Sequence, residues 1–493
     1  MSENWCLEHL KSLNIVDRRT NALNELKSHL ITVGNNDAAV YDQVLSSKNL
    51  FECLSETNSE DSSLACDVLA ICMSNLEIEK SIKNTSLLES ALTHRNPQVQ
   101  ALGCNEISRI LRNCPNGIKD VNIVIALIDC LKSKELNVSL PCIPILVLLL
   151  PQFIDISTVY GRFLQTLDGD ASVKCRTYEI AIKIGKETPE LLNKVENILE
   201  KAINDLDSTD ILFQLNVVEI LSELAENNHG MVYLENKGVF VSLLKKIERI
   251  QDNPLNNLMI PGLMKFYGRI ATVHPNKIFE NSPQVIHALF DCLVISLDYT
   301  ILPTALDTLG ILGKSREGKI YLENGFGQKI KDTLHEMGAG IQNLPTDLKV
   351  RVLDCLSNLF YTNPSENDNQ LTCITESWYS NLTQNDQTLQ FIFKYIQNPF
   401  TDIKGAAYLF LKTILHLKWG HERLIKTGGL IEYLLDRTTE SDKDMKITKY
   451  EIICLLAESN VFSPRILVQL KNYVSEGAFY VRGVTEVAVD GAD

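Results

Sequence analysis

One short phrase occurs twice in this chain, and it limits the possible folds more than any other feature of the sequence. Tyr-Leu-Glu-Asn is found in "HGMVYLENKG", which begins at His229, and again in "EGKIYLENGFG", which begins at Glu317. In both copies the tyrosine follows a glycine, Gly230 or Gly318, by three residues. A catalytic motif is rarely duplicated within one chain, whereas a repeated structural unit is duplicated by definition. The repetition therefore predicts an architecture of stacked units.

A third copy, "KWGHERLIKTGGLIEYLLDR", supplies a third anchor glycine, Gly420. Apolar residues recur at fixed distances from all three anchors, and spacings of three and four place side chains on one face of a helix. The recurring residues lie four positions after each anchor (Leu234, Leu322, Leu424) and six, nine and thirteen positions before it (Leu224, Leu312, Ile414; Leu221, Leu309, Leu411; Val217, Ala305, Ala407). Each copy predicts a helix, a turn at the anchor glycine, a short second helix, a glycine break and a third helix.

The glycines of each copy, which are the anchors and the break glycines Gly238 and Gly428 eight residues after two of them, are expected to supply the left-handed backbone that helix ends and tight turns require. In the repeated phrase, tyrosine and leucine are expected to point inward, with glutamate and asparagine at the turn.

The spacing between anchors indicates the length of the unit. The separations are 318 − 230 = 88 and 420 − 318 = 102 residues, each close to two units of the roughly 40–47 residues typical of armadillo or HEAT repeats. We therefore predict an all-α, armadillo/HEAT-like superhelical solenoid of about ten or eleven units over residues 1–472. The final segment, "EGAFYVRGVTEVAVDGAD", loses the helical period, so residues 473–493 are predicted to form an extended acidic C-terminal tail.

Charge and cysteine usage narrow the partners and the compartment. A net charge of −15 argues against nucleic acid or an anionic membrane as partner, because both need clustered Lys and Arg. The 13 cysteines are odd in number and form no Cys-x-x-Cys pair, which is typical of buried free thiols in a reducing compartment. The predicted location is the cytoplasm, with the nucleus as a further location.

The stretch from Leu136 to Ile154 contains no charged residue and resembles a membrane span. A spanning helix needs about 20 predominantly apolar residues, and this stretch is interrupted by Pro141, Pro144 and Pro151. It is predicted to be a core helix that is buried on all sides.

The motifs that resemble nucleotide-binding or metal-binding sites do not meet the requirements of those sites. Gly313-Lys314-Ser315 imitates the end of a phosphate-binding loop, but Thr308 replaces the required glycine and no strand precedes it. A helix end followed by a turn is the preferred interpretation. His416 and His421 are five residues apart, whereas a metal-binding pair on a helix needs a spacing of four and a third ligand, so both are predicted to be surface histidines. The sequence predicts no catalytic residue, no cofactor and no metal.

The remaining possibility is a protein-recognition surface. An importin-type ladder of Trp-x-x-x-Asn is absent, because His9, Leu382 and Arg423 lie four residues after the three tryptophans. Aromatic and polar residues lie side by side in Pro261–Ile270 and Thr375–Leu382, and Tyr, Trp and Arg are enriched at interface hot spots. The candidate partner-binding residues are Lys265, Tyr267, Arg269, Trp378 and Tyr379. The alternative is that Phe266 and Trp378 fill the core between helices.

These two stretches, together with "DTLGILG" (Asp307–Gly313) and "YVSEGAFYV" (Tyr473–Val481), resemble the non-ATPase regulatory subunit 5 family of the 26S proteasome. The resemblance runs nearly end to end and is clearest from Gly230 onward. It implies a non-enzymatic armadillo/HEAT-like chaperone for assembly of the base of the regulatory particle. The implied partners are the proteasomal AAA+ ATPase subunits, bound chiefly through their C-terminal domains, and a large non-ATPase base subunit as a further partner. The implied chaperone is absent from the mature particle.

Two other functions remain open from the sequence. The first is a general armadillo-type scaffold for protein–protein interaction in signalling or trafficking. The second is an enzyme, for which saturable ATP binding that depends on Lys314 would be the diagnostic.

Overall fold

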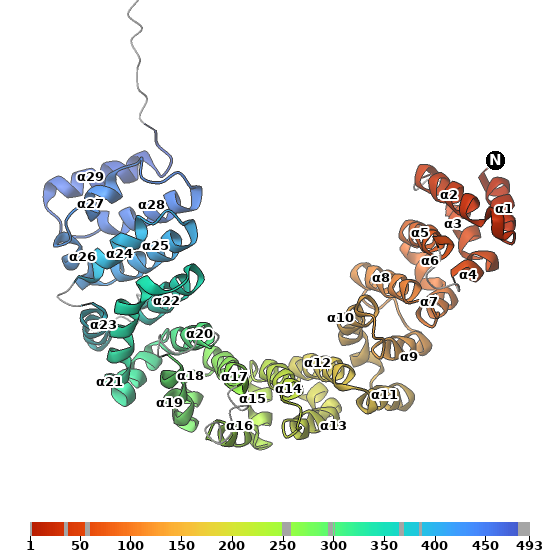
Figure 1. Cartoon of the computed structure of the whole chain (residues 1–493), viewed down its shortest axis with the longest axis horizontal. Helices are drawn as coiled ribbons and strands as arrows, with labels where there is room; N and C mark the ends of the chain where they lie inside the picture. The colour runs from red at the N-terminus through yellow and green to blue at the C-terminus, as the bar shows by residue number, and fades with distance from the viewer. Residues whose placement is uncertain are drawn as a thin grey trace, which may run out of the picture. The chain divides into compact units, whose positions relative to one another are not determined.

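The computed structural model describes residues 2–33, 38–54, 60–248, 258–293, 299, 301–363, 369–383 and 387–481. In these residues the secondary structure consists of helices joined by turns, with no strand. The chain divides into two compact units, Met1–Leu234 and Glu235–Asp493. Figure 1 shows the helices of each unit following one another in chain order. The predicted all-α fold is confirmed.

Unit 1 consists of antiparallel helices with short connections. Its helices are α1 (Ser2–Ser12), α2 (Val16–Val33), α3 (Ala38–Leu45), α4 (Lys48–Leu54), α5 (Glu60–Asn75), α6 (Ile78–Lys83), α7 (Thr85–Leu92), α8 (Pro97–Asn113), α9 (Val121–Cys130), α10 (Leu136–Phe153), α11 (Ser157–Leu164), α12 (Ala171–Glu187), α13 (Pro189–Asp205), α14 (Ile211–Leu224) and the start of α15 (Asn228–Asn236).

Unit 2 is built in the same way. Its helices are α16 (Val239–Glu248), α17 (Ile260–Val273), α18 (Pro275–Asn281), α19 (Pro283–Cys292), α20 (Leu302–Leu312), α21 (Arg316–Gly340), α22 (Thr346–Phe360), α23 (Asn369–Leu382), α24 (Thr388–Ile396), α25 (Thr401–Leu415), α26 (Lys418–Ile425), α27 (Leu430–Leu435), α28 (Lys443–Ala457) and α29 (Pro464–Glu476). Helix α21 contains a kink at Phe326, whose backbone is not helical.

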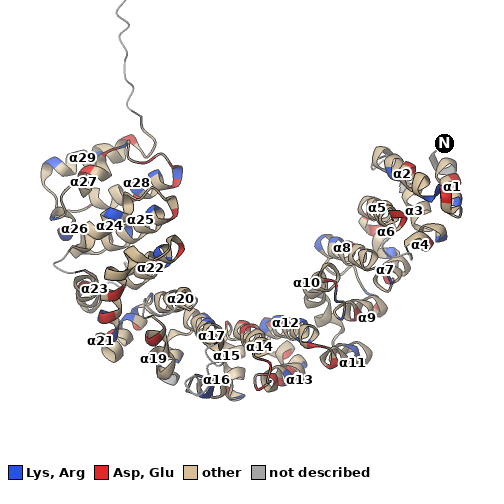
Figure 2. Ribbon diagram, viewed as in Figure 1, with Lys and Arg blue, Asp and Glu red and all other residues tan. Residues whose placement is uncertain are grey.

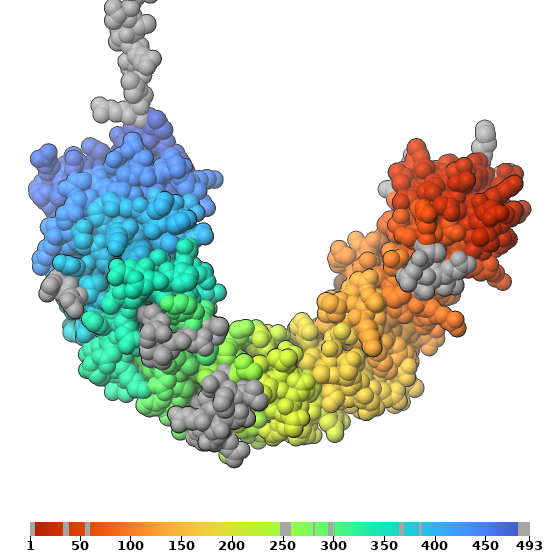
Figure 3. Space-filling model, in the orientation of Figure 1, coloured from red at the N-terminus to blue at the C-terminus, as the bar shows by residue number. Residues whose placement is uncertain are grey.

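Each repeat begins with a core helix that packs against the core helix of a neighbouring repeat. In unit 1 these helices are α2, α5, α8, α10, α12 and α14, and in unit 2 they are α17, α20, α22, α25 and α28. Eleven such helices occur in the described residues, in agreement with the predicted ten or eleven units. Figure 3 shows that, within each unit, side chains of neighbouring repeats pack together. This is the nearest-neighbour packing of a solenoid.

The apolar residues found at fixed offsets from the anchors form the core. All twelve are at most 1% exposed, so the prediction of one buried face per helix is confirmed. The core helices contribute the residues before each anchor, and the helix that follows contributes the leucine after it.

The expected role of the anchor glycines is wrong. Gly230, Gly318 and Gly420 are each the third residue of a helix, in α15, α21 and α26. Among the described glycines, a positive φ is found only at Gly238, Gly429 and Gly477, so the expected left-handed backbone is confirmed for the break glycine Gly238 and wrong for Gly428 and the anchors. Glycine is needed at each anchor because the backbone there lies very close to the end of the preceding core helix. A Cβ on Gly230, Gly318 or Gly420 would lie 2.0, 1.8 or 2.2 Å from the carbonyl oxygen of Leu224, Leu312 or Ile414, respectively.

The expected packing of the repeated phrase is confirmed for Tyr233, Leu234 and Leu322, which are buried, and is wrong for Tyr321 and the two glutamates. Tyr233 is buried, but Tyr321 is 36% exposed and donates from its hydroxyl to the Phe279 carbonyl at 2.6 Å. The two glutamates lie within helices rather than at turns. Glu235 pairs with Lys277 at 2.7 Å, and Glu323 accepts a hydrogen bond from Trp378 Nε1 at 2.8 Å. The phrase therefore joins neighbouring repeats through polar contacts.

Ion pairs between neighbouring repeats recur along both units. Lys27 pairs with Asp67 across 40 residues of sequence, Arg351 with Asp307 across 44, and Lys412 with Glu451 across 39. These separations correspond to one repeat each, which supports the predicted repeat length.

The C-terminal helix is longer than predicted, because α29 continues to Glu476 and ends at Gly477, which has a φ of 86°. The residues that follow remain attached to the unit through Arg437. Its guanidinium donates to the Gly477 carbonyl at 2.8 Å and lies over the rings of Tyr473 and Tyr480. Most of the predicted tail, residues 482–493, lies outside the described residues, so the tail remains a prediction.

Candidate functional site: an apolar ridge on α10

The most unusual surface of unit 1 lies on α10. Leu136, Leu140, Pro144 and Leu148 are all exposed, and the three leucines are 59%, 49% and 59% exposed. A spacing of four residues places these side chains along one side of the helix. We refer to these four residues as the α10 ridge. Exposed apolar side chains that are contiguous in this way are typical of protein-interaction sites.

The opposite side of α10 explains why this segment folds as it does. Val138, Cys142, Leu146 and Leu149 are fully buried, and α10 packs against α8, α9 and α12. Packing of this apolar side therefore anchors the helix in the repeat stack and leaves the ridge toward solvent. The prediction that α10 is buried on all sides is wrong, because one side is open.

Helix α10 also carries three prolines in its interior, Pro141, Pro144 and Pro151. Proline has no N–H, so it cannot donate to the carbonyl four residues before it. The carbonyls of Asn137, Leu140 and Val147 therefore lack their usual helical donor.

By length and composition, α10 is the one helix among the described residues that could cross a membrane, and half of it is buried inside the fold. Figure 2 shows no Lys, Arg, Asp or Glu along it, in accord with its sequence. Partial burial against three neighbouring helices is the behaviour of a core helix.

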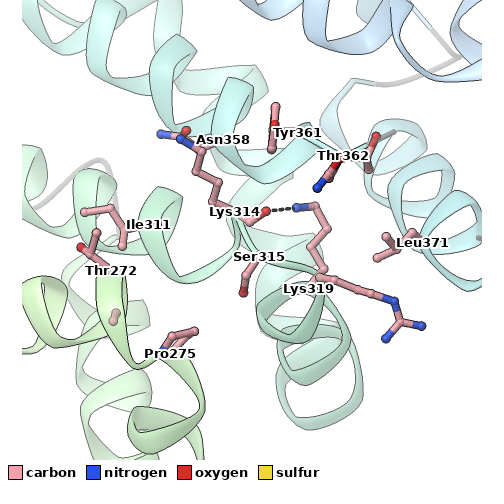
Figure 4. Close-up of a pocket in the computed structure, with 13 residues that line it drawn as sticks. Thr272, Pro275, Ile311, Lys314, Ser315, Lys319, Asn358, Tyr361, Thr362 and Leu371 are labelled. Atoms are coloured by element: carbon pink, nitrogen blue, oxygen red, sulfur yellow. Dashed lines mark hydrogen bonds between the residues drawn. The ribbon is translucent and has the colours of Figure 1, made fainter. Parts of the chain in front are cut away.

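A second feature is a pocket of about 340 Å³ in unit 2. It lies where α17, α20 and α22 end, and its lining includes Thr272, Ile311 and Tyr361 (Figure 4). Lys314 and Ser315 of the Gly313-Lys314-Ser315 segment also line it. Gly313 caps the C-terminus of α20, and Ser315 caps the N-terminus of α21. The interpretation as a helix end followed by a turn is therefore confirmed.

Two of the cationic side chains that line this pocket, Lys319 and Lys314, are engaged by groups of the protein itself. Lys319 is 1% exposed and donates to the carbonyls of Gly313 at 2.7 Å and Lys314 at 2.8 Å; Figure 4 shows its ammonium group directed at the turn. These carbonyls lie at the negative end of the α20 dipole. The Lys314 ammonium lies 5.6 Å from the centre of the Tyr361 ring. Lys319 thus stabilises the turn, and the arrangement differs from a phosphate-binding loop.

The five predicted partner-binding residues separate into two groups. Tyr267, Trp378 and Tyr379 are at most 1% exposed, so these three predictions are corrected: the side chains fill the core and cannot contact a partner. Lys265 is exposed and Arg269 is partly exposed, and their role in partner binding remains a prediction. The alternative that Phe266 and Trp378 are core residues is confirmed.

The two histidines predicted to lie on the surface, His416 and His421, also differ in exposure. His416 is exposed as predicted. His421 is partly buried, and its ring nitrogens lie 2.8 Å from Ser459 Oγ and 2.6 Å from the Leu415 carbonyl oxygen. The prediction of a surface position is therefore wrong for His421, which links two repeats.

The sequence contained a signal for the α10 ridge that the periodicity argument missed. The four ridge residues are spaced regularly in an uncharged stretch, but an uncharged stretch does not distinguish its open side from its buried sides. The absence of charge therefore favoured complete burial.

Fold and surface together define the class of this protein, an all-α helical-repeat protein of the armadillo/HEAT kind with an exposed apolar ridge. Importin beta is similar in structure, with a TM-score of 0.62 and 12% identity over 92% of this chain and 60% of that one. A structure of the Kap95:Nup1 complex gives a TM-score of 0.61 and 13% identity over 92% and 57%. These similarities show the fold alone.

The chain belongs to the family described as proteasome non-ATPase 26S subunit, which matches residues 2–493. The 26S proteasome non-ATPase regulatory subunit 5 of Drosophila melanogaster is 30% identical over 504 aligned positions, which cover 99% of both chains. The Homo sapiens protein of the same name is 28% identical and covers 90% of both. The resemblance seen in the sequence is confirmed, and the family membership supports a proteasome-associated role.

Proposed function

We propose that this protein is a non-enzymatic chaperone for assembly of the base of the 26S proteasome regulatory particle. In this proposal it binds AAA+ ATPase ring subunits, chiefly their C-terminal domains, and a large non-ATPase base subunit is a further partner. It acts in the cytoplasm and the nucleus and leaves before the particle is complete. The observation that carries the proposal is the match of the whole chain to a proteasome subunit family.

The α10 ridge supports a protein partner for this chain. Fully burying a leucine contributes about 1.5–3 kcal/mol, and the ridge leucines are already about half buried. Three of them therefore contribute roughly 2–5 kcal/mol to association. A contribution of this size aids binding but is too small to make it permanent, which suits a chaperone that must release its client.

Release follows from competition between interfaces. A partner leaves when a second binding surface offers it a lower free energy, and no nucleotide use by the chaperone is needed. The net charge of −15 favours a client with a basic face, because charge complementarity speeds encounter and disfavours other acidic proteins.

Affinity purification of the tagged protein tests the proposal. We expect free ATPase subunits to co-purify and mature, doubly capped particles to lack the protein. Stoichiometric amounts in mature particles would refute the chaperone function.

A double substitution, Leu140→Glu with Leu148→Glu, tests the ridge. It should weaken capture of ATPase subunits by at least about tenfold, which corresponds to about 1.4 kcal/mol. Leu409→Glu is the matched control, since Leu409 is an exposed leucine of similar exposure (47%) on α25. Equal loss of capture in both variants would show that the ridge is not the binding surface.

The same purification tests the general scaffold function, and an ATP-binding assay tests the enzyme function. A general scaffold would recover non-proteasomal proteins as its main partners. An enzyme would show saturable ATP binding that is lost in Lys314→Ala; we expect no such binding, because the nearby Lys319 ammonium is engaged by two carbonyls.

A further inference from the structure

Three cysteines from three helices of unit 1 meet in its core. Cys104 lies on α8, Cys130 is the last residue of α9, and Cys142 lies on α10. Their sulfur atoms all lie within 4.8 Å of one another, and those of Cys104 and Cys142 are 3.5 Å apart. All three side chains are at most 4% exposed. Among the described residues, this is the one group of three metal-ligating side chains within such a distance.

The distances match a single atom bound to three sulfurs. For a bond of about 2.3 Å, such as zinc–sulfur, a planar three-coordinate centre separates its sulfurs by about 4.0 Å, and a tetrahedral one by about 3.8 Å. A pyramidal centre brings them closer still. The Cys104 and Cys142 sulfurs are already 3.5 Å apart, and all three sulfurs lie within 4.8 Å of one another, so small adjustments of the side chains would suffice.

The environment selects which thiophilic atom fits. The site is enclosed by buried apolar helices, and each empty thiol has a backbone acceptor nearby: Cys142 Sγ is 3.1 Å from the Val138 carbonyl oxygen, and Cys130 Sγ is 3.5 Å from that of Leu92.

A divalent ion bound to three thiolates would leave one net negative charge among these buried helices. Burial of an unpaired charge is strongly unfavourable. A trivalent atom bound to three thiolates is neutral, and it needs no fourth ligand. Soft ligands such as thiolate also prefer soft, thiophilic centres.

We propose that Cys104, Cys130 and Cys142 form a buried trithiol site for a trivalent, thiophilic arsenic-type centre. The reaction with arsenous acid is As(OH)₃ + 3 RSH → As(SR)₃ + 3 H₂O. Three S–H and three As–O bonds break, three As–S and three O–H bonds form, each hydroxyl leaves as water, and arsenic remains trivalent, so no oxidant or reductant is needed. The product ties α8, α9 and α10 together beneath the α10 ridge.

The test uses the full-length protein, with arsenite as the probe. Native mass spectrometry should show one arsenic atom bound with the loss of three hydrogens. X-ray absorption should show three sulfur neighbours and no oxygen on the arsenic. Because ligands that bind the native state stabilise it, arsenite should raise the melting temperature of unit 1.

Variants locate the site. Cys142→Ala and Cys130→Ala should each lose the three-sulfur complex, whereas Cys373→Ser, which removes an exposed cysteine, should keep it. Circular dichroism checks that each variant is folded. The measurements on the wild-type protein stand even where a variant does not fold.

Several outcomes would overturn the proposal. The proposal is wrong if arsenite does not bind, if it still binds to folded Cys142→Ala, or if an oxygen atom is found in the arsenic coordination shell. It is also wrong if arsenite lowers the melting temperature, because arsenite would then trap the unfolded chain. Tighter binding of zinc than of arsenite at the same cysteines would overturn the choice of a neutral complex.

Discussion

Replacement of Gly318 by alanine should strongly destabilise unit 2, although it adds a single methyl group. The added Cβ would lie 1.8 Å from the carbonyl oxygen of Leu312, whereas real Cβ atoms essentially never approach other heavy atoms closer than 3.0 Å. The start of α21 must therefore move by about 3.0 − 1.8 = 1.2 Å from the end of α20. The obstacle is backbone and cannot rotate away as a side chain would.

The size of the effect follows from three contributions. Overpacking of this kind costs up to about 3 kcal/mol. The shift also disturbs the cap of α21, in which Gly318 N donates to Ser315 Oγ at 3.0 Å, and loss of such a cap costs about 1 kcal/mol. Alanine regains about 1 kcal/mol over glycine in helix propensity. The expected net loss is about 3 kcal/mol, or a fall in melting temperature of roughly 6–12 °C for a unit of this size.

Thermal and urea unfolding, followed by circular dichroism, measure this loss. Gly325→Ala is the matched control in the same helix, because the nearest atom to its added Cβ lies 3.9 Å away; it should be neutral or stabilising by up to about 1 kcal/mol. Gly230→Ala and Gly420→Ala should resemble Gly318→Ala. If Gly318→Ala unfolds at the same temperature as Gly325→Ala, close backbone approach is not the reason for the anchor glycines.

Three further predictions test other parts of the structure. Trp378→Ala should lower the free energy of unfolding by about 3–5 kcal/mol, as a buried aromatic residue does, whereas Lys265→Ala should leave it unchanged within about 0.5 kcal/mol; denaturant titration of both variants measures the difference. Arg351→Ala should cost less than about 1 kcal/mol in the same titration, because the Arg351–Asp307 pair is exposed. Burial lowers the pKa of Lys449 to about 8 from the ordinary 10.5, so the unfolded state binds more protons between these values. The contribution of Lys449 to the free energy of unfolding should therefore rise from pH 8 to pH 10.5 and be constant below pH 8. When unfolding is measured across this range, the free energy of unfolding should rise less steeply with pH in Lys449→Met than in the wild-type protein.

The sequence predicted the helical stack because the relevant information is periodic. Leu221, Leu224 and Leu234 lie on one face of their helices at offsets that recur in each copy, and burial of that face is the main driving force of such a fold. The repeat length follows from the anchors, and the ion pairs between neighbouring repeats agree with it.

The sequence did not predict features that depend on contacts between repeats. The anchor glycines are in helices, and only the position of the preceding core helix shows why a side chain is excluded there. Trp378 and Tyr379 have the composition of an interface, yet they are buried because α23 presents them to neighbouring helices. Composition identifies residue types that can bind a partner strongly, but it does not show whether the fold buries those residues in the core.

Helix α10 shows how folding and binding can be separated in this chain. Its buried side, including Val138 and Leu146, accounts for its place in the stack. The exposed leucines at 140 and 148 add little to that packing, and interior prolines weaken a helix. Stability alone therefore gives no reason for the ridge, whereas a partner that covers it gives one. Glutamate at both leucine positions should accordingly leave the melting temperature unchanged and weaken client capture; a large fall in melting temperature would instead make the ridge part of the fold.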